Sequence, residues 1–212
     1  ERTDEEVSGT LRLTYDINDD VMVYGGYSRG FKAGGFNLDR QLNGPIGADG
    51  YLNSDNSFAA ETVDSYELGF KSQLFGNVVQ LNGSVFFQQV GDFQLNTFNG
   101  IAFVVESIDE AETYGAELDF FYATPIEGLD LTAGYAYTNT EYTEVNTGDP
   151  LVDALQGQDF SLVPEQTFTT QVIYSRPVFD NLLASASLDA RWASEYNTGS
   201  DLDPEKVQDA FT

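Results

Sequence analysis

Two runs of alternating apolar and polar residues meet at a short turn between Glu61 and Leu95. In the first run Tyr66 and Leu68 have one parity, whereas Glu67 has the other. A period of two residues places successive side chains on opposite faces of a β-strand. In the second run the apolar parity belongs to Val79, Leu81, Gly83, Val85 and Phe87. Only Phe86 interrupts its polar face, so the stretch predicts a long antiparallel hairpin with one apolar and one polar face.

The alternation recurs along the rest of the chain. Further runs lie at about 7–17, 21–31, 114–122, 129–138, 167–175 and 182–192. Short and long connections alternate, and the long ones fall at about 32–60 and 143–164. Asn99-Gly100, the strongest short-range hairpin signal, joins runs 93–98 and 101–108. We expect about eight to nine strands, with tight turns at one end of the sheet and loops at the other.

The length of the runs fits a membrane-spanning strand. A run of about ten residues rises roughly 23 Å when it is tilted near 45°, which matches the apolar band of an outer-membrane barrel. Aromatic residues of apolar parity fall near both ends of the runs, as the girdles of such barrels do. Those near the loops are Tyr27, Tyr66, Phe87, Tyr114, Tyr135, Tyr137, Phe168 and Trp192, and those near the turns are Phe120, Tyr122 and Tyr174. We therefore predict an all-β fold, an antiparallel up-and-down transmembrane β-barrel.

The barrel is expected to be partial. The chain begins at Glu1 without a methionine, and residues 206–208 resume a possible strand just before its end. About eight strands with open edges would leave unpaired backbone groups in lipid. We expect residues 1–212 to be one domain, a piece of a larger barrel.

Composition narrows the function. The chain has 9 basic and 35 acidic residues, a net charge of -26, which disfavours nucleic acid and anionic membrane surfaces as partners. It contains no cysteine and no histidine, so disulfides, thiolate metal sites and the commonest general base are excluded. No apolar run approaches the roughly 18 residues of a spanning helix, but a spanning strand leaves no such signal. We expect no enzymatic activity, catalytic residue or cofactor.

Two motifs could carry chemistry, and each also has a simpler interpretation. The run from Arg29 to Gly35 is rich in glycine but lacks the Gly-Lys-Ser/Thr ending of a phosphate-binding loop. Acidic residues of polar parity, Glu61 with Glu67 or Glu117 with Asp119, could form an acid/base pair. The alternative is a hydrated lumen wall with partly paired charges, formed by Arg12, Glu67, Lys71, Glu117, Asp119, Asp189 and Arg191.

Loop residues supply two further hypotheses. Carboxylates that could bind calcium are Asp149, Asp153 and Asp159, or Asp201 and Asp203, although none follows the spacing of an EF-hand, and we expect no metal site. Aromatic residues in the long loops could stack on a ligand at the barrel mouth or pack among the loops. These ligand-contact candidates are Phe31, Phe36, Tyr51, Phe58, Phe98 and Phe103.

The sequence resembles the TonB-dependent outer-membrane receptors. The resemblance rests on YGGYSRGFKAGGFN at 24–37, ETVDSYELGFKSQL at 61–74, Asp92-Phe93-Gln94 and Tyr114-Gly115-Ala116-Glu117, and it spans nearly the whole chain. It implies a complete barrel of about 22 strands, plugged by an N-terminal domain and energised by TonB. The plug and the TonB-contacting segment have no counterpart in these residues.

The resulting prediction is an active-transport receptor in the outer membrane of a Gram-negative bacterium. By resemblance it would take up an iron-siderophore or a similarly large, scarce extracellular ligand. Its partners would be outer-membrane lipid, the remaining strands and plug of the same receptor, TonB, and the ligand. One alternative is a secreted all-β module that binds a ligand or carbohydrate, with its apolar faces packed as a sandwich core. Another is an outer-membrane hydrolase that depends on Glu67.

Overall fold

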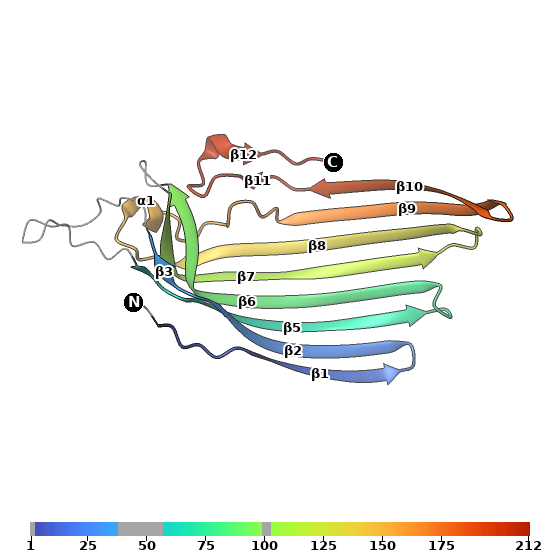
Figure 1. Ribbon diagram of the computed structural model, residues 1–212, viewed down its shortest axis with the longest axis horizontal. Coiled ribbons are helices and arrows are strands. Elements are labelled where there is room, and N and C mark those ends of the chain that lie inside the picture. Colours follow the sequence, from blue (N-terminus) through green and yellow to red (C-terminus); the bar gives the residue numbers. More distant parts are fainter. Residues whose placement is uncertain (1–2, 38–56, 99–102) are drawn as a thin grey trace, which may run out of the picture.

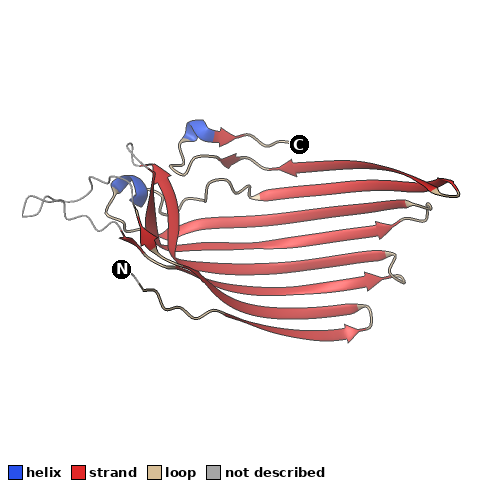
Figure 2. Cartoon of the chain, viewed as in Figure 1, coloured by secondary structure: helices blue, strands red, loops and turns tan. Residues whose placement is uncertain are grey.

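The computed structural model describes residues 3–37, 57–98 and 103–212, and it is dominated by one sheet of eight antiparallel strands (Figures 1 and 2). Their order in the sheet is β1-β2-β5-β6-β7-β8-β9-β10, so every strand pairs with its neighbours along the chain. Their bounds are β1 Gly9–Asn18, β2 Val21–Lys32, β5 Glu61–Leu74, β6 Val79–Phe98, β7 Phe103–Ala123, β8 Leu129–Glu144, β9 Gln166–Phe179 and β10 Leu182–Ala193. The predicted all-β, up-and-down architecture is confirmed.

Short elements occupy the long connections and the segment after β10. They are β3 Gly35–Phe36, β4 Ser57–Phe58, α1 Pro150–Asp153, β11 Tyr196–Asn197, η1 Pro204–Lys206 and β12 Val207–Gln208. β3 pairs with β4, and β11 pairs with β12, so the strand expected at 206–208 is only a two-residue pairing. The Asn99-Gly100 turn lies outside the described residues. Within the described ranges no helix is long and apolar enough to cross a membrane.

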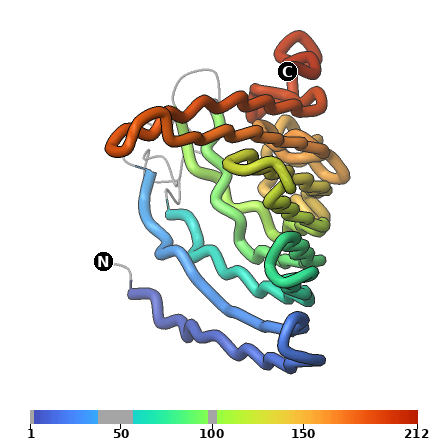
Figure 3. Tube along the Cα trace, turned by 90° about the vertical axis from the view of Figure 1, so that its right-hand side faces the viewer, coloured from blue at the N-terminus to red at the C-terminus, as the bar shows by residue number. Residues whose placement is uncertain are grey.

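The sheet is curved and open (Figure 3). β1 and β10 form its two edges, and the outer side of β10 carries only an isolated bridge between Ala193 and Phe211 among the described residues. Figure 1 shows tight turns at one end of the strands and loops at the other, as the connection lengths predicted. The sheet is therefore a partial barrel wall, with a convex outer face and a concave lumen face.

The predicted facing of the hairpin at 61–95 is correct. Leu68 is 62% exposed and lies opposite Val85, which is 53% exposed. The next residue, Gly69, has the other parity and is buried. The sandwich alternative required these apolar side chains to be buried between two sheets. Because they lie exposed on a single sheet, that alternative does not fit.

Phe86, which interrupts the polar parity, has a specific place on the lumen face. It lies opposite Glu67 on β5 and beside Gly115 on β7. A Cβ atom added at Gly115 would lie 2.7 Å from the Phe86 ring and 2.1 Å from the Tyr137 carbonyl oxygen. Phe86 is thus accommodated because the neighbouring strand carries no side chain there.

The hydrophobic core of the described residues lies beyond the membrane span, at the loop end. We call it the cap core, and its buried members are Val90, Leu95, Ile108, Ala111, Tyr142, Val145, Val152 and Leu155, with Val63, Phe93, Phe160 and Leu202 packed against them. Several members come from residues 145–163, the cap segment, which the sequence suggested to be part of a long loop. This connection therefore folds back onto the strands.

The ends of β6 and β7 leave the plane of the sheet (Figure 1). Their paired arms 93–98 and 103–108 form what we call the hairpin extension. The bend falls at Asp92, whose φ of 54° is unusual for a residue other than glycine. Viewed along the strands, the hairpin extension lies on the concave side of the sheet (Figure 3).

Candidate functional site

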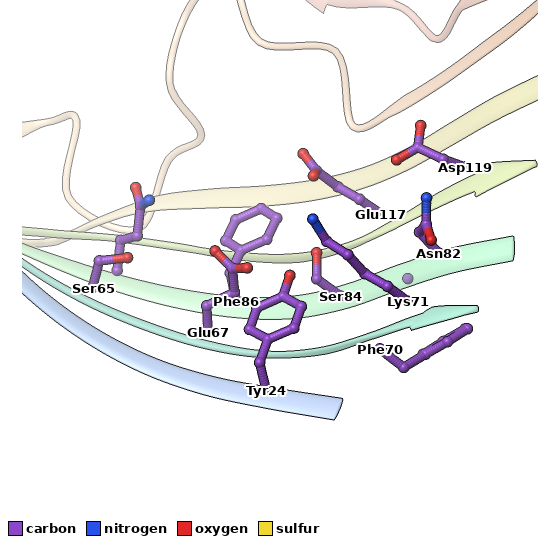
Figure 4. A pocket seen from close by; sticks show the side chains of 12 residues that line it. Tyr24, Ser65, Glu67, Phe70, Lys71, Asn82, Ser84, Phe86, Glu117 and Asp119 are labelled. Atoms are coloured by element: carbon purple, nitrogen blue, oxygen red, sulfur yellow. The ribbon is translucent and has the colours of Figure 1, made fainter. Parts of the chain in front are cut away.

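The lumen wall contains a polar groove of about 400 Å³ between β2, β5, β6 and β7. Tyr24, Lys71 and Glu117, from three different strands, point to the same side of the sheet (Figure 4). The residues that line the groove are Tyr24, Ser65, Glu67, Phe70, Lys71, Asn82, Gly83, Ser84, Phe86, Gln88, Glu117 and Asp119. The groove brings together Glu67, Lys71, Glu117 and Asp119, which the sequence placed on the polar face. Glu61 does not line it.

Charged groups on this wall are partly paired. Arg12 lies 3.6 Å from a Glu67 carboxylate oxygen, and its guanidinium carbon lies 4.6 Å from the centre of the Tyr24 ring. Farther along the sheet, Gln171 donates a hydrogen bond to Asp189. Glu67 is thus engaged by a permanent cation, which suits a hydrated wall better than the proton-transfer role of the hydrolase hypothesis.

Glu61 is separate from this groove and belongs to the mouth. Its Oε2 atom accepts a hydrogen bond of 2.9 Å from the Gln94 backbone and lies 4.0 Å from Lys32 Nζ. The suggested pairing of Glu61 with Glu67 is therefore not formed, because the two carboxylates are tied to different partners.

The carboxylates considered for calcium stabilise loop backbone instead. Asp149 caps α1 by accepting from Leu151 N at 2.9 Å, and Asp153 accepts from both the backbone and the hydroxyl of Thr147. Asp203 caps η1 in the same way, by accepting from Glu205 N. In the part of the chain that the structure describes, no group of three or more acidic residues could hold a metal ion.

Asp201 is held by a cation. It accepts a hydrogen bond of 2.5 Å from Lys206 Nζ, and this contact lowers the pKa of the Asp201 carboxyl below its usual range. Asp159 behaves in the opposite way, because burial, with Glu165 and Glu141 nearby, raises its pKa. The Lys206 contact of Asp201 thus supports the loop that follows β10.

Three aromatic rings form the centre of the cap core. The ring centroids of Phe93 and Phe160 lie 5.1 Å apart, those of Tyr142 and Phe160 lie 4.6 Å apart, and those of Phe93 and Tyr142 lie 5.8 Å apart. Tyr142 is 2% exposed, and burial raises the pKa of its hydroxyl to about 12. These distances lie within the range of favourable aromatic pairs.

A half-buried carboxyl lies opposite the cap-core residue Leu95 on the paired strand. Glu106, on the β7 arm of the hairpin extension, has a pKa raised by burial and further by the charge of Asp149. The structure thus places an acidic side chain where its charged form is poorly solvated.

The described ligand-contact candidates lie at the loop end, and none of them lines the polar groove. Phe31, Phe36 and Phe103 are 45%, 49% and 68% exposed. Phe58 packs over Gly35, where an added Cβ would meet its ring at 2.7 Å. Tyr51 lies outside the described residues, and Phe98 is described only by its backbone pairing with Phe103. Their role as ligand contacts stays a prediction.

Sequence reasoning missed the cap core. Its aromatic residues, Phe93, Tyr142 and Phe160, are far apart in sequence, and Phe160 lies in a stretch without alternation. A usable signal was Asp149-Pro150, because an acidic N-cap followed by proline at the first helical position marks a helix start. It would have predicted order within the cap segment.

Comparisons with known proteins agree with this architecture. The family model described as TonB dependent receptor-like, beta-barrel, matches residues 1–212. The chain is similar in structure to the ferric yersiniabactin uptake receptor FyuA from Yersinia pestis, with 20% sequence identity and a TM-score of 0.74 over 98% of this chain and 28% of that chain. It is also similar to BauA, the ferric preacinetobactin receptor from Acinetobacter baumannii, with 18% identity and a TM-score of 0.65 over 96% and 28% of the two chains.

The copper transporter OprC gives a comparable match, with 16% identity and a TM-score of 0.65 over 96% of this chain and 29% of that chain. At such identities the structural likeness shows the fold alone. The chain spans less than a third of the length of each of these three proteins. Because the family model covers every residue, the chain belongs to the TonB-dependent receptor β-barrel family, whose place is the outer membrane of Gram-negative bacteria.

Proposed function

We propose that residues 1–212 form part of the barrel wall of an active-transport receptor that takes up an iron-siderophore complex or a similarly large, scarce ligand. The family is one of receptors and transporters. The observation that carries the proposal is the division of one sheet into three surfaces: an apolar outer face, a polar lumen groove, and a folded mouth with exposed aromatic side chains. Transport through a gated lumen needs each of these three surfaces, whereas catalysis of a chemical reaction does not require any of them.

The ligand class is supported by two of the similar structures, which are receptors for ferric yersiniabactin and ferric preacinetobactin. The copper transporter among them makes a metal-containing ligand of another kind the competing outcome. The proposed partners are outer-membrane lipid around the outer face, the remaining strands and plug of the same receptor, TonB as the energy source, and the extracellular ligand. No enzymatic step is proposed.

Uptake of radioactive iron tests the proposal. A strain that lacks the gene would be compared with one that produces the native-length protein, using a panel of ferric siderophores under iron limitation. We expect uptake of at least one complex that disappears when TonB is deleted. Uptake of copper alone, or uptake that persists without TonB, would contradict the proposed function.

The ligand-contact candidates can be tested in the same strains. Phe36→Ala and Phe103→Ala should each weaken binding about two- to tenfold, because one aromatic contact contributes about 0.5–1.5 kcal/mol. Leu151→Ala is the matched control, since Leu151 is an 81% exposed apolar residue of the mouth that is not aromatic. Equal effects at the three positions would remove the aromatic residues as ligand contacts.

A further inference from the structure

We infer that the hairpin extension is a fixed wall of the receptor mouth, held bent by the cap segment and by the described ends of the β2–β5 connection, residues 33–37 and 57–60, so that these parts move as one body. The consequence of this wall for ligand capture rests on the proposed function, whereas the geometry of the hairpin extension does not. Asn37, Gln94 and Phe160 are assigned as positioning residues. Asn37 and Phe160 contact the hairpin extension from the two neighbouring segments, and Gln94 ties its β6 arm to the β2–β5 connection.

The cap segment holds one face of the hairpin extension. Phe93 and Leu95 on the β6 arm have the parity that faces outward in the membrane span, as does Ile108 on the β7 arm. Here that face lies against the cap core: Leu95 is 6% exposed, Ile108 is 0% exposed, and the Phe93 ring contacts Phe160. Straightening the hairpin extension would separate these side chains and expose them to water.

The connection between β2 and β5 holds the two arms through hydrogen bonds. Asn37 binds the β7 arm twice, by donating from Nδ2 to the Val105 carbonyl at 2.9 Å and by accepting from Val105 N at 2.8 Å. The Asn37 side chain thus makes the same two hydrogen bonds to Val105 that an opposite residue in an antiparallel strand would make. The Ser107 hydroxyl adds a third bond by accepting from Ala59 N at 2.9 Å.

Gln94 ties the β6 arm to both ends of the same connection. Its side-chain amide donates to the carbonyl oxygens of Ala33 and Ala59, each at 3.0 Å. Its backbone N–H donates to Glu61 at 2.9 Å. One residue of the hairpin extension thus bridges the base of the loop that precedes β5 and the start of β5.

These contacts distinguish a wall from a lid. A lid needs a low-energy route between two positions, usually with few buried contacts and a free hinge. The hairpin extension instead has a buried apolar face and hydrogen bonds on both arms, and its bend at Asp92 lies at the base of the β6 arm. A large ligand would therefore meet a pre-shaped opening, and any closure over it would shift the hairpin extension together with the segments bound to it.

Distance measurements between two spin labels test the inference on the native-length protein in outer-membrane vesicles. Cysteines would be introduced by Asn96→Cys, on an exposed position of the hairpin extension, and by Tyr66→Cys, on the outer face of β5. Residues 1–212 contain no cysteine, and any cysteine elsewhere in the native-length protein would first be replaced by serine. We expect one narrow distance distribution, which becomes about twofold broader on Phe160→Ala and on Asn37→Ala.

Leu151→Ala, on the exposed side of α1, is the control and should leave the distribution narrow. The melting temperature of the barrel should stay unchanged in all three variants, which separates positioning from a general loss of structure. Asn37→Ala removes only the two part-buried hydrogen bonds to Val105 and leaves the cap core intact, so it remains informative if Phe160→Ala disturbs folding. A broad or two-peaked distribution in the parent protein, or one that neither substitution widens, would overturn the inference. A narrow distribution in a protein that takes up no iron complex would reject the proposed function alone.

Discussion

Ile108 and Leu118 lie on the same strand, β7, with the same parity, yet their surroundings are opposite. Leu118 is 46% exposed on the outer face of the span, and Ile108 is 0% exposed in the cap core. Against β6 the strand keeps its register between them, because residues 93 and 91 of β6 pair with 108 and 110 in the same frame. Its register against β8 shifts between Glu110 and Ala111 without changing the parity of Ile108 relative to β6. One periodic pattern thus serves two environments.

The difference lies in the solvent that each segment meets. In the span, lipid covers apolar side chains, and the outer face needs no protein partner. Above the span the same face would meet water, so the chain must bury it itself. The bend at Asp92 and the folded cap segment achieve this, and together they produce a small soluble-type core at the top of a membrane-type wall.

The largest expected effect comes from the buried member of the pair. Ile108→Ala should lower the local opening free energy of the hairpin extension by about 2–5 kcal/mol, because it leaves a cavity in the cap core. Leu118→Ala, which removes the same kind of side chain from a lipid-facing site, should change it little. Hydrogen exchange of the β6 and β7 amides measures both. Similar losses at the two positions would break the comparison.

A charge on the outer face of the span should have the next largest effect. Leu68→Arg is expected to lower the free energy of unfolding by about 2–4 kcal/mol near mid-bilayer. Ser65→Arg, on the lumen side of the same strand, should be tolerated because a polar groove surrounds it. Urea unfolding in lipid vesicles gives the two values, and equal values would contradict the assigned facing.

The lumen face of the span should show a smaller packing effect. Gly115→Ala is expected to destabilise the barrel by about 1–3 kcal/mol, because the added methyl group meets the Phe86 ring and the Tyr137 carbonyl oxygen. Gly30→Ala is the matched control, since no atom lies within 4 Å of the position of its Cβ. Thermal unfolding measures the pair, and an unchanged midpoint for Gly115→Ala would show that the strands shift without penalty.

The smallest expected effect is a pH dependence in the stability of the hairpin extension and the cap core. Burial and Asp149 raise the pKa of Glu106 in the folded cap above its value in the unfolded chain, so the charged form is disfavoured on folding. The resulting penalty is present above the raised pKa and is relieved as the pH falls through it. Glu106→Gln should therefore stabilise the cap at pH 7 and remove this part of its pH dependence. Opening free energies of the cap, compared at pH 5 and pH 7, check the sign, and stronger acid stabilisation in the variant than in the parent would refute it.

The sequence by itself determined the strands, their order and their two faces. Leu68 and Val85 could be assigned to an outer face because a strand has a fixed period of two, and the single exception, Phe86, lies on the lumen face where that parity puts it. The polar groove follows from the same rule, since Glu67, Lys71 and Glu117 share the inner parity of adjacent strands. The family resemblance, carried by short motifs in these strands, was correct for the same local reason.

Only the tertiary structure decided what happens beyond the span. Phe93, Tyr142 and Phe160 meet from β6, β8 and the cap segment, and no local pattern links residues so distant in sequence. Periodicity assigns a face to Ile108 but cannot tell whether lipid, water or another loop will cover it. That choice depends on the bend at Asp92 and on contacts with two other loops, which exist only once the chain is folded.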